Sequence, residues 1–128
     1  MELLLDTHAL LWWLDGDTHL SAPAQDAIGD ETNAVWVSAA SAWEIATKVR
    51  IGKLPGACYV ADHFGRILDE QSFRALPITV EHALRAGSMP GEHRDPFDRL
   101  LIAQTQAEGL TLISNEMLFD DFGVRRLW

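Results

Sequence analysis

The feature that most constrains the fold is a regular alternation of short apolar runs with stretches of helical character. Residues 2–5, 35–37, 75–78, 110–113 and 124–127 are short runs typical of strands. Strands that alternate with helices along a chain usually pair in parallel, with the helices covering the sheet. The pattern therefore predicts an α/β fold, a three-layer α/β/α sandwich with a mostly parallel central sheet.

Capping and helix-breaking residues mark where the helices between these strands begin and end. We expect an acidic or hydroxyl cap at most helix starts, a proline in the first turn of two helices, and a glycine near most helix ends. The expected helices run from Thr7 through Leu14, from Ser21 toward Gly29, from Ala42 to Val49, from Tyr59 to Glu70, from Thr79 to about Gly87 and from Asp95 to Gly109, with a short helical segment after Asn115.

Length and composition predict one soluble domain spanning residues 1–128. No apolar run approaches the roughly 20 residues that span a bilayer, and the first residues lack the features of a secretory signal. We therefore expect a cytoplasmic protein without a membrane association. The single cysteine, Cys58, excludes a disulfide within the chain and a cysteine-rich zinc site, so we interpret it as structural.

The formal charge of −9 argues against binding nucleic acid through lysine and arginine alone. Clustered carboxylates that hold a divalent cation would also make a chain acidic, and the cation would then meet the phosphate. Net charge therefore excludes a purely basic binding surface but not a metal-dependent nuclease.

Four acidic residues fall at related places: Asp6 ends the first strand, Glu44 lies in the helix after the second, Asp98 opens a helix and Glu116 follows the fourth strand. Each has a structural explanation as a helix cap, as the last residue of a capping box that starts at Ser41, or as a charge near a helix N-terminus. In a parallel sheet, however, the carboxyl ends of the strands share one edge, where these acids would gather.

Several carboxylates at one place repel one another and raise one another's pKa unless a cation neutralises them. Ligation by oxygen alone favours Mg²⁺, with Mn²⁺ as a substitute, over zinc. Such an ion lowers the pKa of a bound water and stabilises charge on a phosphate, so we expect one or two ions and hydrolysis of a phosphodiester.

Four segments closely resemble the PIN-domain ribonucleases, specifically the VapC-like toxins of bacterial toxin–antitoxin pairs: Leu4–His8, Ser38–Ile45, Asp95–Gln104 and Leu112–Glu116. The resemblance implies a metal-dependent endoribonuclease whose antitoxin covers the active site with its C-terminal segment. It also implies that Asp6, Glu44 and Asp98 are the metal-binding catalytic acids. Glu116 stands where the family usually has aspartate, so we expect it to ligate directly or through water.

Other residues near these segments are candidates for supporting roles. Neighbouring basic side chains, Arg99 and the pair His93 and Arg94, are candidates for RNA phosphate contacts, although solvation at the surface explains them equally. We expect Trp36 and Trp43 to pack in the core, and exposed aromatics elsewhere would favour a homodimer or a toxin–antitoxin hetero-oligomer. The residues expected to orient carboxylates or water around the metal, or else to cap helices, are Thr7, Ser38, Ser41, Ser114 and Asn115.

Two other functions are compatible with acids at a sheet edge. A phospho-acceptor signalling domain also carries a strand-end aspartate near acidic metal ligands, but such domains resemble one another in a lysine after a late strand, where this chain has Ser114–Glu116. A non-catalytic binding module would use the acids only as helix caps and would bind no metal. The sequence does not specify which RNA is cut.

Overall fold

A five-stranded parallel sheet forms the centre of the computed structural model, which describes residues 1–93 and 95–128. The strands lie in the order β3-β2-β1-β4-β5, and each neighbouring pair that the structure describes is parallel. The parallel sheet predicted from the sequence is thus confirmed. The strands are β1 (Glu2–Leu5), β2 (Ala34–Ser38), β3 (Arg74–Leu76), β4 (Thr111–Ile113) and β5 (Arg126–Leu127).

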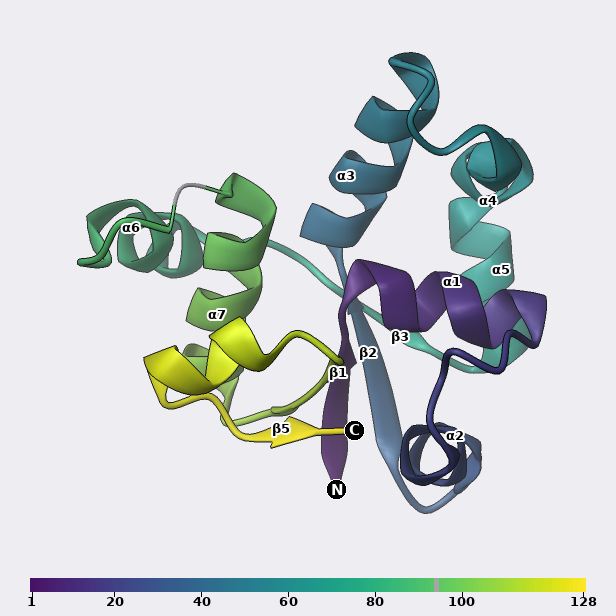
Figure 1. The fold of residues 1–128 in the computed structure, drawn as a ribbon, viewed down its shortest axis with the longest axis horizontal. Helices are drawn as coiled ribbons and strands as arrows, with labels where there is room; N and C mark the ends of the chain where they lie inside the picture. Colours follow the sequence, from purple (N-terminus) through teal and green to yellow (C-terminus); the bar gives the residue numbers. More distant parts are fainter. Residues whose placement is uncertain (94) are drawn as a thin grey trace.

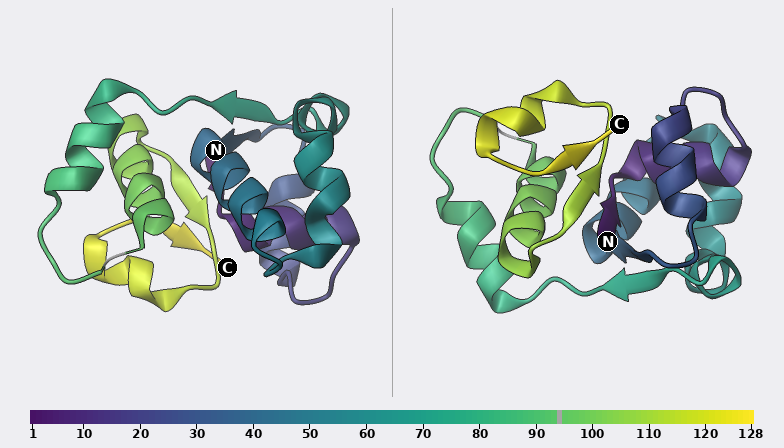
Figure 2. Two further views of the ribbon diagram at one scale, coloured as in Figure 1. Left: turned by 90° about the horizontal axis from the view of Figure 1, so that it is seen from above. Right: turned by 90° about the horizontal axis from the view of Figure 1, so that it is seen from below.

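Helices cover both faces of this sheet, which gives the expected three layers. Helices α1, α2, α4 and α5 lie on one side of β1, and α6, α7 and the 3₁₀ helix η2 lie on the other (Figures 1 and 2). Helix α3 leaves β2 and rises beyond the edge of the sheet (Figure 1). The helices are α1 (Thr7–Asp15), α2 (Ala22–Gly29), α3 (Ala39–Arg50), η1 (Pro55–Ala57), α4 (Cys58–Asp62), α5 (Phe64–Gln71), α6 (Val80–Ser88), α7 (Pro96–Glu108) and η2 (Met117–Phe122).

Strand β1 lies at the centre of the core because its leucines pack on both faces of the sheet. Leu3 and Leu5 pack with α1, α2 and α5 on one side, whereas Leu4 packs with α7 and η2 on the other. All three are fully buried. A strand buried on both faces reads as a continuous apolar run rather than an alternating one, as residues 3–5 do.

Most of the predicted helix starts are confirmed, and two predictions are wrong. Asp6, Ser21 and Asp95 each accept a hydrogen bond from a backbone N–H in the first turn, as caps do. Helix α3, however, begins at Ala39 and is capped by Ser38, so the capping box expected from Ser41 to Glu44 does not form. Ser41 and Glu44 both lie inside the helix.

The second error concerns residues 59–70, where one helix was expected and two are found. The break lies at His63, whose φ of −126° and ψ of 26° are not helical. Its N–H closes α4 by donating to the carbonyl oxygen of Tyr59. The apolar spacing continues across the break because α4 and α5 bury neighbouring parts of the same core, so periodicity alone does not reveal the two axes.

Two side chains differ in burial from their predicted roles. Trp43 is 53% exposed rather than packed in the core, because it lies on the outer face of α3. Cys58 is also exposed and belongs to the start of α4 rather than to the interior. Within the described part of the chain, no helix combines the length and apolarity needed to cross a bilayer.

The register of the strands determines what meets at the edge of the sheet. Leu5 is paired with Val37 of β2 and with Ile113 of β4. The residues that follow, Asp6 and Ser114 among them, therefore leave the sheet at one level and on one edge, and the Asp6 N–H donates to the Ile113 carbonyl at 3.1 Å. The carboxyl edge of three neighbouring strands is the expected position of a site in such a fold.

Candidate active site at the carboxyl edge of the sheet

Asp6 is a buried carboxylate at the junction of β1 and α1. It is 5% exposed, and its Oδ1 accepts the Ala9 N–H at 2.8 Å as the cap of α1. Burial raises its pKa to about 6, against the lowering effect of hydrogen bonds from Ser114 and Ala9. The nearby charge of Glu116 raises this pKa further. A buried acid with a perturbed pKa is a candidate functional residue as well as a cap.

Glu44 lies one turn and a half into α3 and is 7% exposed. Thr7, the neighbour of Asp6, donates its hydroxyl to Glu44 Oε1 at 2.6 Å, and the Thr7 oxygen lies 3.1 Å from the Ser41 hydroxyl. The other oxygen of Glu44 forms an ion pair with Lys48, one turn later on the same helix. Thr7 thereby connects the start of α1 with the acid of α3.

Asp98 lies in the first turn of α7, three residues after the cap, Asp95. Its Oδ2 is 2.9 Å from Nε2 of His93. Burial is the main cause that raises the pKa of Asp98, with smaller contributions from Asp95 and Glu44, while His93 lowers it. The effect of Glu44 on Asp98 indicates that these two acids lie near each other across α3 and α7, which are in contact.

Glu116 lies at the start of η2 and is exposed, as is Asn115. Its N–H donates to the Ser114 hydroxyl at 3.0 Å, and that hydroxyl also hydrogen-bonds Asp6. Ser114 thus connects the fourth predicted acid to the first. The exposed carboxylate of Glu116 is positioned at the mouth of the site rather than inside it.

The side chains do not form a closed set of metal ligands. Across residues 1–93 and 95–128, no group of three histidine, cysteine or acidic side chains is arranged to hold a metal ion. Two neighbouring groups instead face the acids: the Lys48 ammonium is paired with Glu44, and the His93 imidazole with Asp98. The donor set still fits a hard cation in its chemistry, since it consists of carboxylate and hydroxyl oxygens.

Lys48 and His93 are the residues whose contacts with the acids the sequence analysis did not identify. The spacing of Glu44 and Lys48, four residues apart on a helix, is a recognisable signal for an ion pair. His93 has no such signal, because it reaches Asp98 from the loop between α6 and α7. His93 and Asp98 are five residues apart in the sequence, and the conformation of this loop brings their side chains into contact.

Two other predicted site residues, Ser38 and Arg99, make contacts that serve the fold. The Ser38 hydroxyl caps α3 through the Ala40 N–H and donates to Gln104. The three guanidinium nitrogens of Arg99 donate hydrogen bonds to the carbonyl oxygens of Ala86, Met89 and His93. These hydrogen bonds hold the loop between α6 and α7 in place. We therefore leave Arg99 out of the proposed RNA contacts. Arg94 lies outside the described residues.

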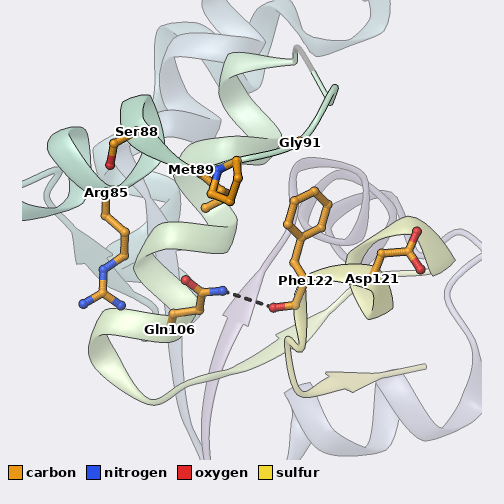
Figure 3. Close-up of a pocket in the computed structure, with 8 residues that line it drawn as sticks. Arg85, Ser88, Met89, Gly91, Gln106, Asp121 and Phe122 are labelled. Atoms are coloured by element: carbon orange, nitrogen blue, oxygen red, sulfur yellow. Dashed lines mark hydrogen bonds between the residues drawn. The ribbon is translucent and has the colours of Figure 1, made fainter.

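A cavity of about 720 Å³ lies beside this loop rather than at the acids. Its walls come from α6, α7 and η2, and a hydrogen bond from the Gln106 amide to the Phe122 carbonyl joins two of its sides (Figure 3). None of the four predicted acids is among the described residues that line it. The candidate site therefore lies at the edge of the sheet and not in this cavity.

The chain is similar to known proteins over its whole length. The family model for the PIN domain matches residues 3–124. A curated relative, ribonuclease VapC16 of Mycobacterium tuberculosis (strain ATCC 25618 / H37Rv), is 42% identical over 60 residues. That match covers 44% of this chain and 38% of the relative, so the chain spans well under half of that protein's length.

Solved structures share the fold at low identity. VapBC2 from Rickettsia felis, in a structure bound to a DNA fragment from its promoter, aligns with a TM-score of 0.69 at 15% identity, covering 99% of this chain and 98% of that one. VapC20 of Mycobacterium tuberculosis, described as a toxin that cleaves the sarcin-ricin loop, aligns with a TM-score of 0.68 at 14% identity and 95% coverage of both chains. These likenesses confirm the predicted fold, and the family model confirms the predicted family.

Proposed function

The chain belongs to the PIN domain family, and from that membership we propose that it is a Mg²⁺-dependent endoribonuclease that acts in the cytoplasm as the toxin of a toxin–antitoxin pair. The observation that carries the proposal is the position of three buried or half-buried carboxylates in the fold: Asp6 ends β1, Glu44 lies in the helix that follows β2, and Asp98 lies in the first turn of α7. We treat residues 1–128 as a single nuclease domain.

The four acids would hold the ion, with Asp6, Glu44 and Asp98 as the main ligands and Glu116 at the mouth of the site. When bound, Mg²⁺ or Mn²⁺ supplies positive charge for the phosphate and lowers the pKa of water. The roles of the chain's own residues follow from their contacts. Thr7 orients Glu44, and Ser114 orients Asp6.

The Lys48 ammonium would neutralise Glu44 when no ion is present, and His93 would hydrogen-bond Asp98. An isolated buried carboxylate is costly, so the lysine cation stabilises the site until another cation takes its place. Ion binding would therefore release the Lys48 ammonium toward the phosphate.

The partner proposal rests on relatives. VapBC structures from Rickettsia felis and Salmonella typhimurium, both DNA-bound, contain a toxin of this fold with its antitoxin. We propose a cognate antitoxin for this chain as well, and a homodimer or toxin–antitoxin hetero-oligomer as its assembly. An acidic site would attract an arginine or lysine of that partner.

The test is chelator-reversible cutting of RNA by the purified chain, freed of any antitoxin. We expect cleavage in Mg²⁺ or Mn²⁺, none in chelator, and a loss of at least about 100-fold in Asp98→Asn, because that change removes charge from the site. Asp121→Asn is the matched control, since Asp121 is an exposed acid of η2. Undiminished cutting by Asp98→Asn would overturn the assignment of the site.

A further inference from the structure

Two aromatic side chains in contact with each other lie on the two helices that carry Glu44 and Asp98. Trp43 immediately precedes Glu44 on α3, and Phe97 immediately precedes Asp98 on α7. Their ring centroids are 4.7 Å apart with an interplanar angle of 70°, an edge contact. The two rings thus join α3 and α7 at the rim of the candidate site.

The indole of Trp43 is available to a ligand. The residue is 53% exposed, and the nearly perpendicular Phe97 ring braces the indole without enclosing it. On the same helix, Glu44 and Ile45 are buried, so the fold directs the neighbouring residues inward and leaves the indole outside. An exposed indole held in a fixed orientation offers a flat face on which a base can stack.

Three basic side chains near the acids, among the residues that the structure describes, make contacts within the chain. Lys48 is paired with Glu44, and Arg99 donates to three backbone carbonyls. Arg126 donates to both carboxylate oxygens of Asp120 and to the Ser114 carbonyl. Stacking of bases on aromatic rings adds binding energy that does not depend on charge, which suits a chain of net charge −9.

We propose that Trp43, braced by Phe97, is a stacking platform for one unpaired base of single-stranded RNA, next to the nucleotide whose phosphate meets the acids. This inference rests on the proposed ribonuclease function. The base is an unpaired one, since a base inside a continuous duplex has both faces covered and does not reach the indole. The contact between Trp43 and Phe97 holds the platform at the junction of α3 and α7, the two helices that carry Glu44 and Asp98.

The test combines a binding measurement with kinetics. Fluorescence anisotropy of a labelled single-stranded RNA in chelator reports binding without cleavage, and initial rates in Mg²⁺ give KM and kcat on the same RNA. We expect Trp43→Leu to weaken binding and raise KM about tenfold, with kcat within about twofold of the original chain. Trp43→Phe keeps a ring and should restore most of the affinity.

Tyr59→Leu is the matched control, because Tyr59 is an aromatic residue of α4 that is 60% exposed and stacks on His63 rather than beside the acids. This variant should bind and cut as the original chain does. Circular dichroism confirms that each variant is folded. Sedimentation velocity of Trp43→Leu and the original chain determines whether the indole joins two protein molecules instead.

The outcomes separate this inference from the proposed function. Metal-dependent cutting with equal KM and binding in Trp43→Leu would overturn the stacking platform and leave the ribonuclease standing. A change of oligomeric state in Trp43→Leu with unchanged RNA binding would assign the indole to a protein interface and would also overturn it. Trp43-dependent binding without any cutting would support the platform and contradict the ribonuclease, and neither binding nor cutting would contradict both.

Discussion

At the scale of single residues, the site is built from carboxylates that the fold keeps at a cost. Asp6 is almost fully buried, and its pKa is raised to about 6 chiefly by that burial. Asp98 shows a shift in the same direction, with burial again the main cause. Groups that serve only the fold are rarely kept in a state that destabilises it, which is why perturbed acids mark functional sites.

The burial of Asp6 predicts a stabilising substitution. In chelator at pH 7, Asp6→Asn should raise the free energy of unfolding by about 2 to 3 kcal/mol, because a pKa of about 6 in the folded state means that ionised Asp6 opposes folding. Asparagine keeps the cap, since its side-chain oxygen also accepts the Ala9 N–H. Urea denaturation of both chains measures the difference.

The sign of the pH dependence follows from the raised pKa. The folded protein binds this proton more tightly than the unfolded chain, so the stability that the protonated form gives is present below about pH 4 and is lost as the pH rises through about 6. The advantage of Asp6→Asn should therefore shrink as the pH falls from 7 to 4. An advantage that is equal at all pH values, or a less stable variant at pH 7, would show that Asp6 is not desolvated as described.

At the scale of elements, cap signals predicted helix starts well where one residue fitted the role. Ser21, Thr79 and Asp95 are each the nearest suitable side chain to a helix start, and each caps as expected. The start of α3 was misplaced because Ser38 and Ser41 both suit a cap in the sequence. The choice depends on a tertiary contact, the bond from the Ser38 hydroxyl to Gln104, which no local pattern contains.

That contact belongs to a buried polar network that holds α3, α6 and α7 together. Gln104, fully buried on α7, accepts the Ser38 hydroxyl at 2.5 Å and donates to the Pro77 carbonyl at 3.2 Å. Its amide also lies 3.3 Å from Nδ1 of His82, whose Nε2 is 2.8 Å from Glu108. The network fixes α7, which carries Asp98, to the strand end from which α3 and Glu44 begin.

Breaking this network should cost much more than a similar change at the surface. We expect Gln104→Leu to lower the free energy of unfolding by about 2 to 3 kcal/mol, since it leaves the Ser38 hydroxyl and the Pro77 carbonyl without their partner. Gln106→Leu is the matched control on the same helix, where an exposed amide donates to Phe122. Equal losses in the two variants, measured in urea, would contradict the role given to the network.

At the scale of the whole molecule, the sheet topology explains how distant residues come together. The alternation of strands and helices predicts a parallel sheet, and a parallel sheet brings strand ends to one edge, so the positions of Asp6 after β1 and of Glu44 in the helix after β2 follow from the sequence. The pairing of Asp98 with His93 does not follow, because it depends on the path of a loop. The exposure of Trp43 does not follow either, since an apolar residue in a helix fits a core position until the axis of α3 is known.

Asp6, Glu44 and Asp98 come from three separate parts of the fold, and we propose that they form one site for a divalent cation. Isothermal titration with Mn²⁺ measures this binding in the original chain, Asp6→Asn, Asp98→Asn and the control Asp121→Asn. We predict saturable binding by the original chain and by Asp121→Asn, weakened at least about tenfold in both of the other variants, because each removes one charged ligand. Equal Mn²⁺ binding by all four proteins, or none by the original chain, would show that these acids do not form the site.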